Sequence, residues 1–250
     1  MNYLLRIGLV AMISFWSIYS GAQSPYKFSW KGDGLVGGIG LTILGGSVLI
    51  NKKVQPITEE EWKQLTRDDV WAFDRVATTR EWANKGAKAR KLSDALLMSS
   101  VMLPFAASIS RGSSGDFRAA GLLSLETMVI NVGLTNLTKG LVKRKRPYTY
   151  NHEEVPWEIM RKQNLLDSRR SFFSGHTSVS SSMYVLGAKM YSDFNPNSDL
   201  RPVVWTTAFV IPAITGWMRV RGGKHYPTDV ITGFLVGSAV GFLVPHFHKE

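Results

Sequence analysis

Two histidines in this 250-residue chain stand beside residue types that phosphate chemistry uses. His225 precedes Asp229 by four residues, so the two side chains can meet across one helical turn. The carboxylate then accepts from one ring nitrogen and leaves the other free to attack. His176 follows Ser174, a good helix N-cap, and Gly175, which has no Cβ to block a ligand. The N–H groups of such a helix start bind anions, and His176 stands where it could pass a proton.

Three basic residues near these histidines are suited to hold phosphate oxygens. Lys139 and Arg146 are seven residues apart, or two helical turns, so both can project from one face. Pro147 ends that helix and fixes where Arg146 points. Arg219 precedes His225 by six residues, and an arginine can engage two oxygens of one phosphate.

Each of these clusters, taken alone, has an ordinary structural interpretation. The basic run can be a solvated membrane surface, the Ser-Gly-His sequence a helix cap, and the His–Asp pair a local contact. Each cluster, however, lies at an end of an apolar segment. Because alternate helix ends fall on the same side of a bundle, we expect the three clusters to meet on one face and enclose a phosphate.

Six apolar segments have to position these clusters. Most are slightly shorter than the roughly 20 residues that cross a bilayer, and the first and last contain no charged residue. Strand patterns are weak, so the expected fold is all-α, a six-helix bundle. A transmembrane bundle is favoured over a soluble helical domain with buried helices. The segments are 35–50, 92–109, 119–137, 178–191, 203–217 and 230–244.

Two other stretches complete the organisation. Residues 1–22 have the pattern of an export signal, in which Arg6 precedes an apolar run and small residues suit cleavage before Gln23. An uncleaved signal anchor is the alternative. Residues 51–91 are polar, and the sequence from Thr58 to Glu61 predicts the capped start of an amphipathic helix. This stretch is therefore interpreted as a helical excursion between the first two core helices.

The composition limits the classes of function. With 44% hydrophobic and 20% charged residues, the chain is not of the disordered class. No cysteine is present, which excludes disulfides, thiolate metal sites and a cysteine nucleophile. The formal net charge of +11 favours anionic partners. Nucleic acid is not expected among them, because the basic residues form no recognition-helix pattern or aromatic platform.

The three clusters resemble the signatures of the type 2 phosphatidic acid phosphatase (PAP2) superfamily. These signatures are Lys-x6-Arg-Pro, Pro-Ser-Gly-His and Ser-Arg-x5-His-x3-Asp, and the chain carries them in that order with their internal spacing intact. Two positions depart from the pattern, since Phe173 replaces a proline and Met218 replaces a serine. The chemistry requires neither residue, so the departures bear on substrate preference more than on activity.

The resemblance implies a role for each site residue. His225 would attack phosphorus and form a phosphohistidine, with Asp229 orienting its ring. His176 would protonate the leaving oxygen and then activate water. Fixed cations would neutralise the transition state, and no carboxylates cluster near the signatures in sequence, so neither a metal ion nor another cofactor is expected. The phosphoryl oxygens would be held by Lys139, Arg146, Ser174, Gly175 and Arg219.

The implied function is that of a metal-independent phosphatase acting on a lipid phosphate or an isoprenoid diphosphate. Three alternatives remain: a soluble periplasmic acid phosphatase of broad specificity, a vanadate-dependent haloperoxidase, and a non-catalytic anion-binding membrane protein. The expected domains are a signal peptide at 1–22, the first core helix with its connecting region at 23–91, and the phosphatase core at 92–250. The oligomeric state is not predicted.

The expected location is the inner membrane of a bacterial cell envelope, with membrane lipids around the bundle. The site is expected to face the periplasm, as in bacterial relatives. This orientation requires segment 35–50 to pack without spanning. If residues 1–22 are removed and all six segments cross, the site faces the cytoplasm, and the excess of Lys and Arg on the motif side agrees with that alternative.

Several polar residues outside the signatures are assigned lesser roles. Glu126 is expected to contact Asn131 or a neighbouring helix. His248 is expected to form an interfacial tail rather than a metal site, because no third ligand is evident. The basic residues 143–145 are expected to face solvent or lipid head groups, and Lys224 is a candidate for binding a substrate head group.

Overall fold

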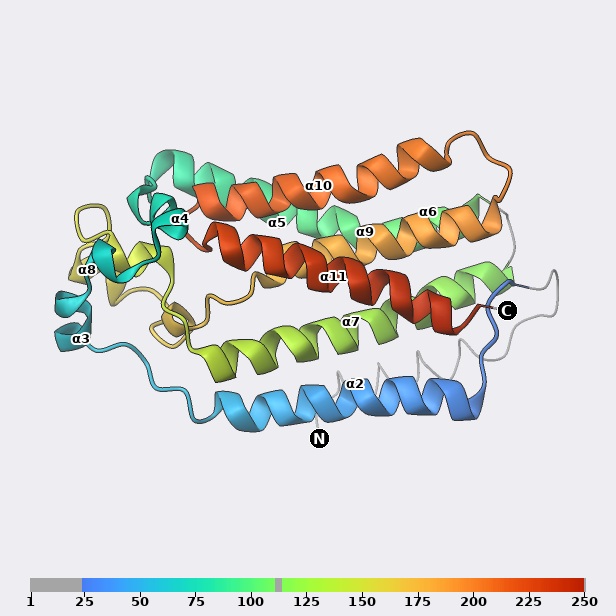
Figure 1. Ribbon diagram of the computed structural model, residues 1–250, viewed down its shortest axis with the longest axis horizontal. Coiled ribbons are helices and arrows are strands. Elements are labelled where there is room, and N and C mark those ends of the chain that lie inside the picture. Colours follow the sequence, from blue (N-terminus) through green and yellow to red (C-terminus); the bar gives the residue numbers. More distant parts are fainter. Residues whose placement is uncertain (1–23, 111–113, 250) are drawn as a thin grey trace.

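Six helical rods lie side by side along the long axis of the molecule (Figure 1). The computed structural model describes residues 24–110 and 114–249, and the expected export signal at 1–22 lies outside these ranges. The expected all-α six-helix bundle is confirmed, and each rod contains one predicted apolar segment. The rods are α2 (Trp30–Asn51), α5 (Asn84–Ser100) continued by α6 (Leu103–Ile109), α7 (Ser114–Val142), α9 (Gly175–Phe194), α10 (Arg201–Arg221) and α11 (Pro227–Phe247).

Helix α9 is the central element of the bundle. Its side chains are largely buried, and it packs against α5, α6, α7, α10 and α11. Its serines find partners on these neighbours, as buried hydroxyls must. Ser178 donates to Asn131 Oδ1 on α7 at 2.6 Å, and Ser181 donates to the Phe234 carbonyl on α11 at 3.0 Å. Helix α9 can carry many serines and still be buried, because the helices around it supply hydrogen-bond partners for them.

Glycines allow α11 to approach α9 closely. A Cβ atom on Gly237 would lie 2.2 Å from the Ser178 carbonyl oxygen, and one on Gly241 would lie 2.2 Å from that of Ser182. Any side chain at these positions would therefore push the two helices apart. The close approach brings the start of α11 beside the start of α9, where two of the three sequence clusters lie.

The outer rods carry apolar side chains on the surface of the molecule. Five helical segments of the described chain are long and apolar enough to cross a membrane. Exposed side chains such as Leu35, Trp217 and Leu235 lie on three of them. The molecule therefore has the surface of a membrane protein. The five segments are Gly32–Asn51, Asn84–Ile109, Asp116–Tyr150, Arg201–Arg221 and Pro227–Phe247.

Short elements cover one end of the bundle, at the left of Figure 1. They are α3 (Glu59–Gln64), α4 (Ala72–Arg75) and α8 (Trp157–Met160), joined by loops and 3₁₀ turns. Helix α3 begins as predicted, with Thr58 Oγ1 accepting from the Glu61 N–H at 3.2 Å. The excursion at 51–91 is thus several short helices rather than one long one.

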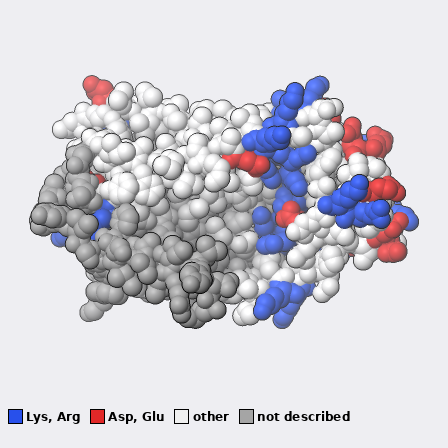
Figure 2. Space-filling view, turned by 180° about the vertical axis from the view of Figure 1, so that it is seen from behind, with Lys and Arg blue, Asp and Glu red and all other residues white. Residues whose placement is uncertain are grey.

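Lys and Arg side chains gather toward this covered end. Figure 2, which shows the molecule from behind, places them in a band between a largely uncharged body and a tip that carries acidic side chains. A basic band beside an apolar surface is the arrangement expected where a protein leaves the hydrocarbon and meets lipid phosphates.

Candidate active site

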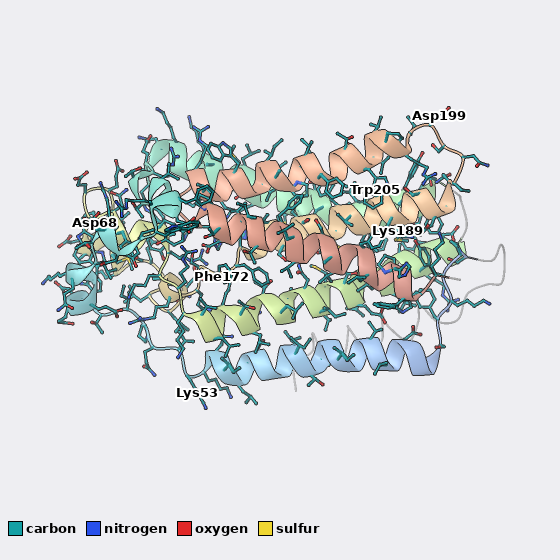
Figure 3. The ribbon with its side chains drawn as sticks, in the orientation of Figure 1. Lys53, Asp68, Phe172, Lys189, Asp199 and Trp205 are labelled. Carbon is teal, nitrogen blue, oxygen red and sulfur yellow. The ribbon has the colours of Figure 1, made fainter. Side chains whose placement is uncertain are left out.

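The three sequence clusters meet at the covered end of the bundle. Helices α7 and α10 end there, and α9 and α11 begin there (Figure 1). The Ser174 N–H donates to the Asp229 carbonyl at 3.0 Å, which joins the second cluster to the third. A Cβ atom on Gly175 would lie 3.5 Å from Lys139 Nζ, so the first cluster borders the second. Phe172, labelled in Figure 3, leads into this junction.

His225 is a neutral imidazole with its lone pair at Nε2. Its side chain is 1% exposed, and Arg146 Nη1 donates to Nε2 at 3.0 Å. A guanidinium can only donate, so Nε2 is the unprotonated nitrogen and the ring proton sits on Nδ1. Nδ1 lies 3.5 Å from Asp229 Oδ2. This is the tautomer that attack by Nε2 requires.

The electrostatic surroundings keep this ring uncharged. Burial lowers the pKa of His225 well below its usual value, and the positive charges of Arg146, Arg219 and Lys139 lower it further. The ring therefore keeps its lone pair at neutral pH. Of these three cations, Arg146 is in direct contact with the ring, 3.0 Å from Nε2.

Asp229 is fully buried and held by several donors. Its Oδ2 accepts from Ser171 Oγ at 2.5 Å and from the Tyr226 N–H at 3.0 Å. Its Oδ1 accepts from Arg144 Nη1 at 2.6 Å, and Arg144 Nη2 also donates to Asp74 Oδ2 at 2.7 Å. The expectation that Arg144 faces solvent or lipid head groups is wrong, because its guanidinium pairs with two buried carboxylates. Asp229 is thereby fixed in place beside His225.

Arg146 is clamped by its own partners. Its Nε and Nη2 donate to the carbonyl and the carboxylate of Asp167 at 2.9 and 2.8 Å, and its Nη1 also donates to the Lys224 carbonyl at 2.8 Å. Burial alone would raise the pKa of Asp167, but the charge of Arg146 lowers it to about 2. The carboxylate therefore stays ionised, and the guanidinium is held rigidly against His225.

His176 and Arg219 both face Asp94 on α5, a residue outside the three clusters. His176 Nε2 lies 2.8 Å from Asp94 Oδ1, and Arg219 Nη1 lies 3.3 Å from the same oxygen. An ionised carboxylate only accepts, so His176 carries a proton on Nε2. The Asp94 side chain is 58% exposed, and one of its oxygens contacts both His176 and Arg219.

Ser174 is the N-cap of α9, as predicted. Its Oγ accepts from the Thr177 N–H at 3.4 Å and lies 2.9 Å from Thr177 Oγ1. The helix then begins at Gly175, whose missing Cβ leaves open the space beside Lys139 and Thr135. A helix start of this kind offers N–H donors and a positive dipole end to an anion.

A comparison with known families bears on this arrangement. A family profile described as PAP2 superfamily matches residues 120–250, just over half of the chain. The chain belongs to the PAP2 superfamily. The match contains all three clusters, so the resemblance is confirmed at the level of the family. PAP2 proteins are generally phosphatases, and the protein has phosphatase-type activity toward phosphomonoesters. A search of solved structures found no significant match.

Two residues that contact the PAP2 clusters lie before the matched region and were missed in the sequence. Asp94 had a signal, because it is an acidic residue inside an apolar segment, and such residues commonly mark functional sites. Asp74 had none, since its partner Arg144 is 70 residues away along the chain. Only the folded chain brings this pair together.

Carboxylates also stand closer to the PAP2 site than the sequence indicated. Each of these four carboxylates contacts an arginine, and three arginines supply these contacts. In the part of the chain that the structure describes, the one group of side chains suited to hold a metal ion lies at the other end of the bundle and consists of Asp33, Glu126 and His248. The four carboxylates are Asp74, Asp94, Asp167 and Asp229.

Lys224 lies at the edge of the site between two aromatic rings. Its Nζ is 4.8 Å from the ring centre of Tyr148 and 5.1 Å from that of Trp82. Burial lowers the pKa of Lys224 to about 7, with the charge of Arg146 adding to the effect. A bound anion would favour the charged ammonium, so the position suits the predicted contact with a substrate head group.

Proposed function

We propose that the protein hydrolyses a lipid phosphate or an isoprenoid diphosphate through a phosphohistidine on His225. One observation carries the proposal: a neutral, buried His225 has its proton toward Asp229 and its lone pair toward a fixed arginine. A His–Asp pair with only a structural role would not require an arginine in contact with the unprotonated nitrogen of the histidine.

In the first step, the Nε2 lone pair of His225 forms a bond to phosphorus. The bond from phosphorus to the leaving oxygen breaks, and His176, as an imidazolium beside the bound phosphate, gives its Nε2 proton to that oxygen and becomes neutral. The cations Arg146, Arg219 and Lys139 stabilise the charge on the phosphoryl oxygens, aided by the start of α9 at Ser174 and Gly175. Asp229 holds the ring and stabilises the positive charge that it gains.

In the second step, His176 takes a proton from water while the water oxygen attacks phosphorus. The N–P bond breaks, its electron pair returns to Nε2 of His225, and inorganic phosphate leaves. For either step, the substrate phosphate has to take the place of the Asp94 carboxylate at His176 and Arg219. Substrate binding therefore replaces the Asp94 carboxylate with the phosphate at His176 and Arg219.

The surface beside the site supports a lipid substrate. Trp217 is 50% exposed two residues before the buried Arg219, and Met98 is 64% exposed one turn after Asp94. Helices α5 and α10 pack against each other. An acyl or prenyl chain could lie along them in the bilayer while the phosphate reaches the site.

The domain organisation that we propose has a phosphatase core at residues 92–250. Helix α2 packs along α7 of this core.

The location that we propose is the inner membrane, and the fold adds a condition on its orientation. Helix α2 has 22 residues, or about 33 Å, and runs along α7 as one of the candidate spans. If the six rods cross, Ser24 and the site lie on opposite faces. A periplasmic site stays a prediction, and it requires Ser24 to lie in the cytoplasm. It is incompatible with a leader that exports Ser24.

Substrate hydrolysis by the purified chain in detergent tests the proposal. We expect release of phosphate from phosphatidic acid or a prenyl diphosphate at least about tenfold more efficiently than from p-nitrophenyl phosphate, since a tail adds apolar contacts. The variant His225→Gln should lose at least about a thousandfold in kcat, whereas the exposed neighbour variant Lys143→Gln should keep activity. A chelator should leave turnover intact. Preference for the soluble ester would contradict the lipid assignment, and full activity of His225→Gln would contradict the mechanism.

A further inference from the structure

The start of α2 and the C-terminus lie at the end of the bundle opposite the site (Figure 1), and a second cluster of titratable side chains lies there. His248 Nε2 lies 2.9 Å from Asp33 Oδ1 and 3.2 Å from Glu126 Oε2. The three residues come from the start of α2, from α7 and from the residue after α11. His248 is buried, with 3% of its side chain exposed, so the expected interfacial tail is wrong for this residue. Glu126 contacts His248 and not Asn131.

The backbone fixes which nitrogen of His248 is available. Nδ1 lies 2.9 Å from the Val244 carbonyl oxygen, which can only accept, so Nδ1 carries a proton. A neutral ring then presents a lone pair at Nε2 to two carboxylate oxygens. Three acceptors converge on one point, and Glu126 Oε2 has no hydrogen-bond partner within the described chain. A histidine that binds a metal commonly donates its other nitrogen to a backbone carbonyl in this way.

The dimensions and the donor set fit a divalent cation. The ligand atoms lie within 4.8 Å of one another. Two ligands at about 2.0–2.1 Å from a tetrahedral metal are about 3.3 Å apart, close to the 2.9 and 3.2 Å between the ligand atoms here. Two carboxylates and one imidazole nitrogen meet in a largely buried place, and a divalent cation suits this donor set.

We propose that Asp33, Glu126 and His248 bind a divalent transition-metal ion such as Zn²⁺ or Mn²⁺. One imidazole and two carboxylates suit these ions, and the partly exposed Asp33 leaves a position for water. The ion joins the start of α2 to α7 and to the C-terminal end, so its role is structural. The site stands apart from His225 and does not depend on the proposed phosphatase mechanism.

Metal binding by the chelator-stripped full chain in detergent tests this inference. The measurements are metal content after dialysis and Zn²⁺ or Mn²⁺ affinity by competition with a chromophoric chelator. We expect one ion per chain and a rise in melting temperature when the ion is added. Replacing an outer-shell residue of a metal site costs roughly 10–100-fold in affinity, so Glu126→Gln and Asp33→Asn, which remove ligands, should each lose at least about 100-fold.

The matched control is His246→Ala, which changes an exposed histidine two residues from His248. This variant should bind the ion like the wild type, while His248→Ala should not. Phosphatase turnover per folded molecule should be the same with and without the ion. Absence of stoichiometric binding to the wild type would overturn the inference. Equal affinity in Glu126→Gln, Asp33→Asn and His246→Ala would overturn it as well, since the ion would then be bound elsewhere.

Discussion

Arg144 shows how a single side chain can secure a catalytic residue from a distance. It pairs with Asp229 and Asp74, which are 0% and 1% exposed, and its guanidinium lies 3.9 Å from the ring centre of Tyr226. Removing it would leave two buried carboxylates without their cation. Asp229 Oδ1 would then lose the donor that holds this carboxylate beside His225.

We predict that Arg144→Met lowers the free energy of unfolding by about 3 kcal/mol or more, because breaking a buried ion pair strands its partner. The loss of Asp229 orientation should also lower kcat. Denaturation in detergent and steady-state kinetics measure both effects. The control Lys143→Met alters an exposed neighbour and should change neither quantity. Equal stability of the two variants would show that Arg144 does not support the site.

Lys224 gives the site a predicted dependence on pH. Its pKa of about 7 means that the ammonium is charged below that pH and loses its charge as the pH rises through it. We predict that kcat/KM falls over this range, because attraction for the phosphate weakens. His225 causes no loss on the acid side until the pH falls below its own lowered pKa.

The variant Lys224→Arg isolates this contribution, since an arginine stays charged throughout. Its alkaline loss of kcat/KM should shift to higher pH. An unchanged pH profile, with an unchanged KM, would remove Lys224 from substrate binding.

Local spacing predicted the residue pairs that lie close in sequence. The Ser174 cap and the pairing of His225 with Asp229 follow from spacings of three and four residues, in which a residue just before a helix contacts the first turn of that helix. Arg144 with Asp74, and His176 with Asp94, are pairs that span 70 and 82 residues. No local pattern encodes such pairs, because they depend on how the helices are arranged in space.

At the scale of elements, the packing of α11 on α9 holds the two halves of the site together. His176 begins α9 and Asp229 lies in the first turn of α11. Gly233, Gly237 and Gly241 stand at four-residue spacing, a pattern that favours close helix packing but does not identify the partner helix. The hydrophobic pattern did not predict the break between α5 and α6 either, because the apolar segment continues from one helix into the other.

We predict that Gly237→Ala destabilises the protein by about 1–3 kcal/mol, because the new Cβ would meet the Ser178 carbonyl. Activity should fall with it as α11 moves from α9. Gly45→Ala on α2 is the matched control. A Cβ there meets nothing within 4 Å, so the change should be neutral or stabilising by about 0.5–1 kcal/mol. Thermal unfolding compares the two, and a greater loss in Gly45→Ala would contradict the packing described for α11.

For the whole molecule, the fold predicts that the two ends of the bundle lie on opposite sides of a membrane. Lys53 follows α2 at the site end, and Asp199 precedes α10 at the other end (Figure 3). The chain has no cysteine, so single cysteines can be introduced without background. In intact cells, a membrane-impermeant maleimide should label only one of the two variants Lys53→Cys and Asp199→Cys. In inverted membrane vesicles, it should label the other. Labelling of both from the same face would contradict a bundle that spans the membrane.

The all-helical class and the six rods followed from the lengths of the apolar segments, which are a property of composition along the chain. The sequence did not predict which face of the membrane carries the site, because this depends on whether segment 35–50 crosses the membrane. In the structure this segment is part of α2, which packs along α7. The same labelling also shows which face carries the site.

The covalent intermediate is the most direct test of the central claim. The chain would be mixed with ³²P-labelled substrate, quenched in alkali within milliseconds, and digested for mass spectrometry. We predict an acid-labile, alkali-stable phosphate on the peptide that contains His225, absent from His225→Gln. The phosphohistidine should accumulate in the variant His176→Ala, because this variant cannot activate water for the second step. The substrate used with this variant should have a good leaving group, so that the first step does not need His176 as the acid. A wild-type enzyme that turns over with no phosphate on His225, or with phosphate on another residue, would contradict the account.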